Sequence, residues 1–127
     1  MTWNQKYSYY NTKKVTTNGT QYDSKFEAAK GQQLEMLKKA KEIKDYDTHL
    51  RTELCVNGYH ICDYYIDFVV YHNDESIEYI EMKGYPTPVW KLKWKLFCAL
   101  FEDKEGITIT LEMQGKQNAP KLRKTRS

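Results

Sequence analysis

Two carboxylates are spaced so that they could bind a divalent metal ion, and a lysine follows two residues after the second of them. Asp67 belongs to the segment of residues 65–71, and Glu81 and Lys83 belong to residues 77–84. Mg²⁺ is usually bound by one or two carboxylates together with phosphate oxygens of the substrate. A metal-bound water is a strong nucleophile near neutral pH, and a neighbouring cation orients it and offsets charge on phosphate. These residue types therefore fit metal-assisted hydrolysis of a phosphate ester.

The two segments that carry these residues predict an antiparallel hairpin. Both are rich in aromatic and β-branched residues, and the polar residues 72–76 between them suit a short loop. A symmetric loop pairs Tyr71 with Ile77, and the same register places Asp67 opposite Glu81. Carboxylates opposed at about 5 Å repel each other, and a cation between them turns that repulsion into binding energy. Strand alternation puts the lysine two residues beyond the second acid on the same face.

A helix is predicted to begin at Ser24 and to run to about Ile43. Ser24 and Glu27 form a capping-box pattern, in which the serine hydroxyl caps the helix and the glutamate reaches back to the cap. We expect one apolar side of this helix to face the core, comprising Phe26, Ala29, Leu34, Leu37 and Ala40. Capping is therefore one explanation of Glu27.

A second hairpin signal precedes the segment of Asp67. Residues 50–56 alternate between apolar and polar side chains, which predicts a half-buried strand. Asn57 and Gly58 then form the strongest short hairpin signal of the chain, and the next strand starts at Tyr59. Three antiparallel strands are therefore expected in succession.

A second helix is predicted after Gly84, with Thr87 as its cap and Pro88 at its first position. We expect its buried stripe to comprise Val89, Leu92, Leu96 and Leu100. Gly106 ends the helix, and residues 107–112 alternate as a last strand. Because a helix separates this strand from the hairpin, the strand should pair in parallel through a right-handed crossover. The expected fold is α/β (α+β), with a mixed sheet flanked by helices.

The second helix carries lysines and tryptophans with different expected surroundings. Lys91 and Lys95 lie four residues apart on the polar side, which suits solvent or phosphate. Lys93 lies near the apolar stripe, so we expect its ammonium group to reach toward acidic groups or phosphate. Trp90 and Trp94 are also four residues apart and could pack against a partner subunit.

Both ends of the chain are basic. Residues 1–21 form an expected arm or short hairpin, with aromatic residues among lysines that include Lys13 and Lys14. Residues 22–113 form an expected single domain, and residues 114–127 a basic tail. Basic arms usually contact nucleic acid, because each neutralised phosphate releases counterions. The alternatives are a solubilising tail and aromatic side chains that cover the domain's own apolar surface.

The composition is ordinary for a soluble globular protein. Hydrophobic residues make up 40% and charged residues 29% of the 127 residues, and the formal net charge is +3. The three cysteines match no disulfide framework, and no hydrophobic N-terminal segment directs export, so we expect reduced thiols in a cytoplasm. A structural zinc site is not expected, because Cys55, Cys62 and His60 lack the usual four-ligand spacing.

Four short motifs, in this order, resemble the PD-(D/E)XK nuclease superfamily, and more narrowly a phage-encoded branch proposed to act like Holliday-junction resolvases. The motifs are residues 22–28 ahead of the first helix, Asp67-Phe68, residues 81–84 and residues 87–97. Ile66 stands at the position of the proline in the superfamily's name. The resemblance implies a restriction-endonuclease-like core in the order αβββαβ.

The same resemblance implies a Mg²⁺- or Mn²⁺-dependent endonuclease that acts on DNA, with no small-molecule cofactor and no membrane attachment. Asp67 and Glu81 would bind the metal together with the Met82 carbonyl. Lys83 would position or activate the attacking water. Glu27 matches an acid of the first helix that faces the metal site, so a metal role stands beside its capping role.

The expected partner is DNA, in branched or other form, and the lysines expected to contact it are Lys91, Lys93, Lys95, Lys13 and Lys14. In the resembling family a lysine of the second helix lies close to the active site, and Lys93 matches that segment. Junction resolution requires paired active sites, so we expect a homodimer. Two alternatives remain open: a non-catalytic DNA-binding recombination accessory protein on the same scaffold, and a partner-binding protein in which the acids and the lysine are ordinary surface charges.

Overall fold

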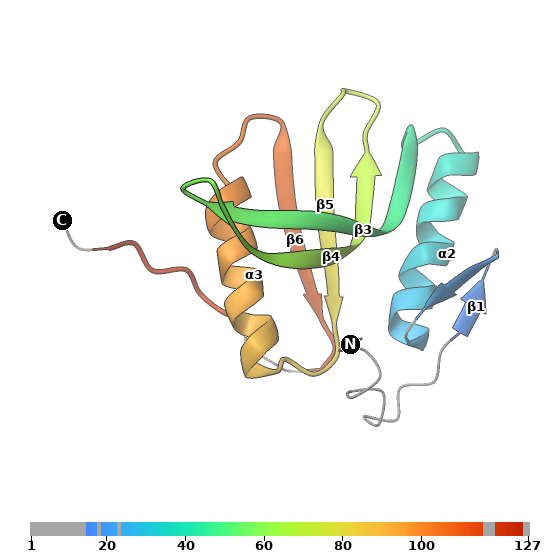
Figure 1. The fold of residues 1–127 in the computed structure, drawn as a ribbon. Coiled ribbons are helices and arrows are strands. Elements are labelled where there is room, and N and C mark those ends of the chain that lie inside the picture. The colour runs from blue at the N-terminus through green and yellow to red at the C-terminus, as the bar shows by residue number, and fades with distance from the viewer. Residues whose placement is uncertain (1–14, 18, 23, 116–118, 126–127) are drawn as a thin grey trace.

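The computed structural model describes residues 15–17, 19–22, 24–115 and 119–125. Its elements are β1 (Val15–Thr17), β2 (Thr20–Tyr22), α2 (Lys25–Lys39), β3 (Asp45–Val56), β4 (Tyr59–Tyr71), β5 (Ile77–Lys83), α3 (Pro88–Phe101) and β6 (Ile107–Met113). From α2 onward this is the expected order of a helix, three strands, a helix and a strand (Figure 1). Among the described residues, no helix is long and apolar enough to cross a lipid bilayer.

A four-stranded mixed sheet in the order β3-β4-β5-β6 forms the centre of the fold. Neighbouring strands from β3 to β5 are antiparallel, whereas β6 runs parallel to β5, with Ile77 beside Ile107 and Lys83 beside Met113. The intervening helix α3 provides the crossover that parallel neighbours need. The prediction of an α/β fold with a mixed sheet flanked by helices is therefore confirmed.

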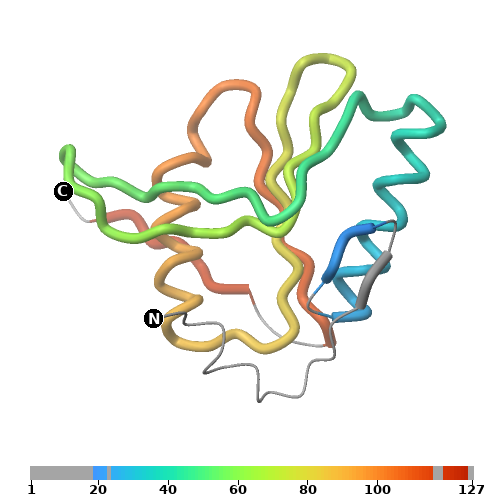
Figure 2. Tube along the Cα trace, turned by 45° about the vertical axis from the view of Figure 1, so that its right-hand side comes forward, coloured from blue at the N-terminus to red at the C-terminus, as the bar shows by residue number. Residues whose placement is uncertain are grey.

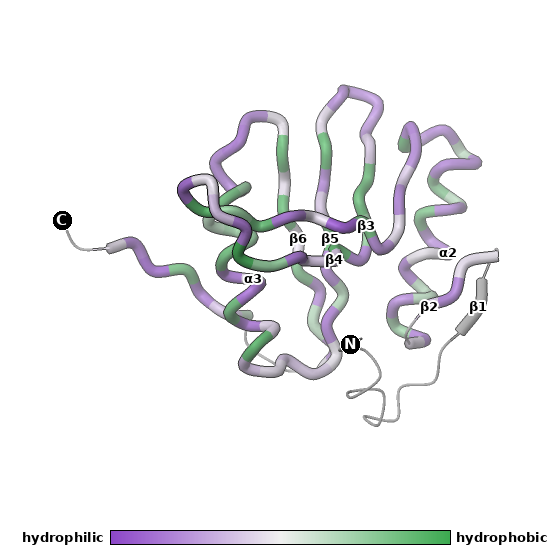
Figure 3. Tube along the Cα trace, viewed as in Figure 1, coloured by the Kyte–Doolittle hydropathy of each residue, from purple (hydrophilic) through white to green (hydrophobic). Residues whose placement is uncertain are grey.

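The two helices cover opposite faces of this sheet. Phe68 and Ile80 pack in a core with α2, whereas their chain neighbours Val69 and Tyr79 pack in a second core with α3. Figure 1 shows α2 and α3 on either side of the strands. Figure 3 shows that the loop between β4 and β5 is hydrophilic. Each face of the sheet thus has its own hydrophobic core, as a layered domain requires.

The side of α2 that packs on the sheet agrees with the expected one at Leu34, Phe26 and Leu37 and differs at the two alanines. Its buried residues are Glu27, Ala28, Gly31 and Leu34. Ala29 and Ala40 are exposed, and the helix ends at Lys39. The buried side contains a charged residue and a glycine, and apolar periodicity does not predict that either residue is buried.

The expected stripe of α3 is wrong at its N-terminal half. Val89 is 55% exposed and Leu92 is 71% exposed. The buried residues of α3 are Trp90, Trp94, Phe97 and Cys98. Both sets recur at helical spacing, and the aromatic set is buried because each large ring removes more apolar surface from water.

β1 and β2 form a small hairpin beside α2, which is the short hairpin considered for this segment. Gly19 in the turn has a φ of 80°, a conformation that glycine adopts readily. Tyr22 at the end of β2 is 2% exposed and belongs to the α2 core. The predicted aromatic arm, with Lys13 and Lys14, lies outside the described residues.

Close packing of β2 against α2 depends on Gly31. A Cβ atom at this position would lie 2.2 Å from the Tyr22 hydroxyl oxygen and 2.4 Å from its Cζ. Alanine favours a helix interior by about 1 kcal/mol over glycine, but overpacking a core costs about 1–3 kcal/mol. We expect Gly31→Ala to lower the free energy of unfolding in urea denaturation. An increase in that free energy would contradict the packing described for Tyr22.

β3 and β4 form a long hairpin that bends at its middle. Asn57 and Gly58 have φ values of 53° and 82°, as a type I′ turn requires, which confirms the predicted hairpin. In β4, Ile66 packs in the α3 core but Phe68 packs in the α2 core, so same-parity residues change faces at Asp67. Figures 1 and 2 both show the outer half of the hairpin crossing over to α3.

β3 is longer and less covered than expected. It begins at Asp45 rather than Leu50, and it lies at an edge of the sheet. Leu54 is fully buried, whereas Leu50 and Val56 are exposed. An edge strand has a partner on one side only, so alternating sequence overstates how much of it the core covers.

Candidate functional site

β4 and β5 part at the position of the two predicted acids. The expected register is confirmed from Tyr71 with Ile77 as far as Phe68 with Ile80. At the next position the Met82 backbone N–H donates to Asp67 Oδ2 at 2.8 Å. Where β4 and β5 separate, the Asp67 carboxylate thus accepts the hydrogen bond that a backbone carbonyl would otherwise accept.

Asp67 lies in a strongly negative environment. Burial raises the pKa of its carboxyl well above the ordinary value, and the Glu81 charge, a hydrogen bond with Glu81 and the Glu27 charge raise it further. The Met82 N–H lowers this pKa and only partly offsets the rise. The acids predicted from sequence therefore come together, and without a cation their mutual repulsion favours a shared proton.

Glu81 is 4% exposed and is held by one of its two oxygens. Its Oε2 accepts hydrogen bonds from the Tyr64 hydroxyl and, at 2.8 Å, from Trp90 Nε1. Its Oε1 has no hydrogen-bond partner among the described residues. A buried carboxylate oxygen without a partner is costly and calls for an explanation.

Trp90 links Glu81 to the predicted lysine. The Lys83 ammonium lies 5.1 Å from the centroid of the Trp90 ring, a cation–π distance. Trp90 is 7% exposed and stacks on Trp94, with centroids 5.9 Å apart. Both tryptophans are buried within this chain, so the expectation that they pack against a partner subunit is wrong. Apolar periodicity favours Val89 and Leu92 instead, because aliphatic and aromatic residues of α3 recur at the same helical spacing.

The backbone around Met82 is oriented as a carbonyl ligand requires. The Lys83 carbonyl accepts from Gln114 N at 2.9 Å, so the backbone of Lys83 faces β6. The Met82 N–H faces Asp67 on the opposite side. In a strand the N–H and C=O of one residue point to the same neighbour, which puts the Met82 carbonyl on the side of Asp67.

Glu27 contributes a third acid from α2. The Ser24 hydroxyl accepts from the Glu27 backbone N–H at 3.1 Å, so the predicted serine cap is present. The Glu27 side chain is buried, and its Oε1 lies 2.6 Å from His49 Nε2. Different atoms of Glu27 thus take part in the cap and in the acid cluster.

His49 was not among the residues selected from the sequence. It lies in β3 opposite Asp67, between the pairs Thr48 with Phe68 and Leu50 with Ile66. Single ligand atoms of Glu27, His49 and Asp67 all lie within 4.8 Å of one another. The sequence offered only a weak signal for this residue, because the predicted strand started one position later.

The three lysines of α3 differ in their surroundings. Lys93 Nζ lies 3.5 Å from the Asp63 carbonyl oxygen, at the long limit of a hydrogen bond. Lys91 and Lys95 are exposed to solvent. The structure therefore brings together Glu27, Asp67 and Glu81, with Lys83 against Trp90 beside them, and it leaves Lys91 and Lys95 as exposed charges.

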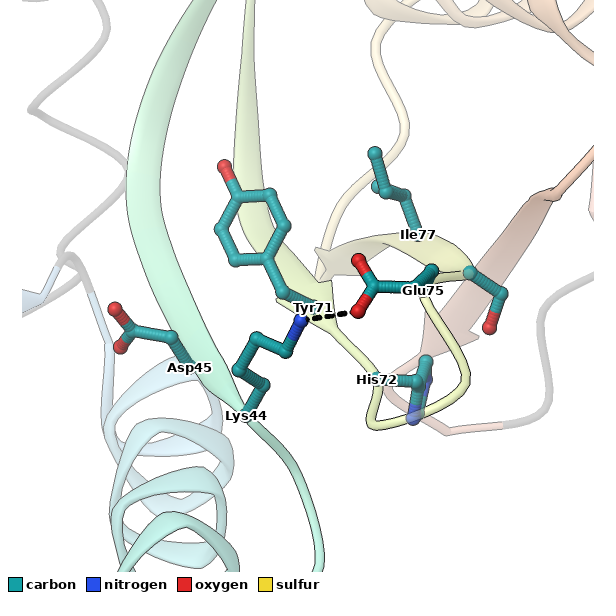
Figure 4. A pocket seen from close by; sticks show the side chains of 7 residues that line it. Lys44, Asp45, Tyr71, His72, Glu75 and Ile77 are labelled. Carbon is teal, nitrogen blue, oxygen red and sulfur yellow. Dashed lines mark hydrogen bonds and ion pairs between the residues drawn. The ribbon is translucent and has the colours of Figure 1, made fainter.

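A shallow hollow of about 360 Å³ lies at the loop end of β4 and β5 (Figure 4). Its walls include Tyr71, His72 and Ile77, whereas the acid cluster lies toward the other end of β5. Its lysine, Lys44, pairs with Glu75 at 2.5 Å. This hollow is separate from the acid cluster, and each of its charged groups has a partner, since Asp45 pairs with Lys38 outside it.

The fold and the site define a mixed α/β protein with a buried carboxylate cluster, beside which lie an imidazole and a lysine. Residues 7–115 match the model of a family described as "Protein of unknown function (DUF1064)", and the chain belongs to this family. No curated protein and no solved structure matches the chain.

Proposed function

We propose that this protein is a divalent-metal-dependent endonuclease that hydrolyses phosphodiester bonds of DNA. The observation that carries the proposal is the buried Glu81 Oε1, which has no hydrogen-bond partner among the described residues and lies in the same cluster as Asp67. A cation between the two carboxylates satisfies this oxygen and removes the repulsion that raises the pKa of Asp67. Mg²⁺ and Mn²⁺ suit such oxygen ligands.

The residues present fit a hydrolytic metal site. Asp67, Glu81 and the Met82 carbonyl would hold the ion, which supplies a Lewis acid and an activated water when bound. Lys83 would orient the water and offset the charge that builds up on phosphate as the bond to the leaving oxygen breaks. Glu27 adds negative charge from α2 and a further acceptor for a water or a cation.

Element order and resemblance extend the proposal to the substrate. An acid on β4 followed by Glu-x-Lys on β5, within the order αβββαβ, resembles the PD-(D/E)XK nucleases. We propose branched DNA, such as a Holliday junction of phage recombination, and a homodimer that pairs two active sites. The proposal includes a location in the cytoplasm, where free thiols such as those of Cys55, Cys62 and Cys98 remain reduced.

The test is cleavage of labelled four-way junction, flap and linear duplex DNA in Mg²⁺, in Mn²⁺ and with chelator. The Asp67→Asn protein, purified identically, reports any contaminating nuclease. Junction-selective cutting that needs metal and Asp67 supports the proposal. Tight binding without cutting under every metal overturns it and favours the non-catalytic accessory protein.

Trp90→Phe should lower the affinity for Mn²⁺ and leave an aromatic ring in the hydrophobic core. The variant keeps an aromatic ring under Lys83 but loses the Nε1–H that donates to Glu81 Oε2. Removing groups that orient metal ligands typically costs about 10–100-fold in metal affinity, and we expect a loss of that size for Mn²⁺ in calorimetry. Trp94→Phe is the matched control, since Trp94 stacks on Trp90 and is equally buried. Equal losses in both variants would contradict a specific role for Trp90.

A further inference from the structure

Glu27, His49 and Asp67 come from three different elements and meet at one point. They lie on α2, β3 and β4. His49 Nε2 lies 2.6 Å from Glu27 Oε1, and the nearest ligand atoms of all three residues lie within 4.8 Å. This spacing lets a single cation reach one nitrogen and two oxygen ligands after small side-chain shifts.

The backbone of β3 is distorted at this point. His49 has a φ of 54°, in the left-handed region that residues other than glycine rarely adopt, least of all within a strand. The Tyr22 ring packs 5.9 Å from the imidazole. The positive φ interrupts the regular alternation of β3 at the one residue whose imidazole lies against Glu27.

A second observation points to a ligand beside this group, at the acid that interacts with Asp67. Glu81, which interacts with Asp67, is 4% exposed, and its Oε1 has no hydrogen-bond partner among the described residues. A proton shared between Glu27 and His49 does not satisfy this oxygen. Asp67 interacts with this acid and also lies within reach of the imidazole. A cation at Asp67 would offset the charge of the carboxylates around it, which one proton shared between Asp67 and Glu81 does only in part.

We propose that Glu27, His49 and Asp67 form a nitrogen-containing cation position that shares Asp67 with the Asp67–Glu81 position and favours a transition-metal ion such as Mn²⁺ over Mg²⁺. Imidazole is a good ligand for transition metals, whereas Mg²⁺ is bound by oxygen and keeps much of its water. The inference rests on the proposed function for its role in catalysis, but the binding of the ion can be measured by itself.

The experiment is Mn²⁺ and Mg²⁺ titration of the full chain, with pulsed electron paramagnetic resonance of the Mn²⁺ form. We expect nitrogen coupling to Mn²⁺ in the wild type and at least about tenfold preference for Mn²⁺ over Mg²⁺. In His49→Ala the nitrogen coupling should vanish and the Mn²⁺ affinity should fall about tenfold, with Mg²⁺ affinity nearly unchanged. Wild-type protein without nitrogen coupling overturns the proposal.

His72→Ala is the matched control. His72, in the loop after β4, pairs with Glu78 of β5 at 3.0 Å, and the side chains of His49 and His72 are each 35% exposed. This variant should keep the coupling and the preference for Mn²⁺. Should His49→Ala fold poorly, His49→Gly replaces it, because glycine accepts the positive φ at this position. Nitrogen coupling that persists in the folded variant overturns the assignment to His49.

The outcomes separate this inference from the proposed function. Nitrogen-coupled Mn²⁺ without DNA cleavage supports the cation position and contradicts the nuclease. Mg²⁺-dependent cleavage without nitrogen coupling supports the nuclease and contradicts the role of His49. Absence of Mn²⁺ binding contradicts the inference outright.

Discussion

Asp67→Asn is expected to reduce DNA cleavage at least about a thousandfold and to raise thermal stability at neutral pH. Asparagine keeps an oxygen that accepts from the Met82 N–H, so the backbone contact at 2.8 Å can remain. It removes the charge that a cation needs and also the charge that repels Glu81. Loss of activity and gain of stability should therefore occur in the same variant, as they would not in a variant that merely misfolds.

The stability gain should depend on pH in a defined direction. In the folded protein the pKa of Asp67 is raised above its ordinary value of 3.8. The folded state therefore binds a proton more tightly than the unfolded chain, and its stability falls as pH rises from the ordinary pKa through the raised one. The difference between wild type and Asp67→Asn should grow over that range. Urea denaturation of both proteins at several pH values measures it.

Two results would contradict this account of Asp67. Cleavage at the wild-type rate in Asp67→Asn would exclude the residue as a metal ligand. A metal-free variant less stable than wild type at neutral pH would show that the carboxylate is not under repulsion.

Lys83→Met is expected to lower kcat by about 10²–10⁴-fold while Mn²⁺ affinity changes little. Methionine keeps most of the length of the lysine stem, so the contact with the Trp90 ring is largely preserved. What is lost is the ammonium group that would orient water and offset charge on phosphate. Single-turnover cleavage together with calorimetric metal titration separates the chemical step from binding.

Lys104→Met is the matched control for this variant. Lys104 also lies over an aromatic ring, with its ammonium 4.6 Å from the Phe101 centroid. It follows the C-terminal end of α3, whereas Trp90 belongs to the first turn of that helix. We expect cleavage by Lys104→Met at the wild-type rate. A collapse of metal affinity in Lys83→Met would instead assign that lysine a structural role.

Local sequence was sufficient for the elements and for much of their pairing. The aromatic and β-branched runs, the polar loop and the Asn57-Gly58 turn are short-range features, and they predicted the antiparallel strands. The register from Tyr71 with Ile77 follows from loop symmetry, and it predicted Asp67 near Glu81, although the paired residues end at Phe68 with Ile80. A helix between strands likewise required β6 to pair in parallel.

The buried side of α3 is harder to predict, because two sets of residues at helical spacing compete and the set that buries more apolar surface faces the sheet. Periodicity alone could not choose between Val89 with Leu92 and Trp90 with Trp94. The sheet decided this: the aromatic stripe packs against it, and Trp90 thereby reaches Glu81. The orientation of a predicted metal ligand thus depends on a residue that sequence reasoning had assigned to a partner interface.

The place of His49 could be found only in three dimensions. Counted back from the pair Val56 with Tyr59 at the hairpin turn, the residue opposite Asp67 would be Thr48. A register shift between Leu54 and Cys55 moves His49 into that position. Such a shift depends together on strand twist, side-chain packing and backbone strain, so no short-range sequence pattern predicts it. Patterns along the chain therefore identified the acids and the lysine, whereas packing of distant segments added the imidazole and the tryptophan that complete the site.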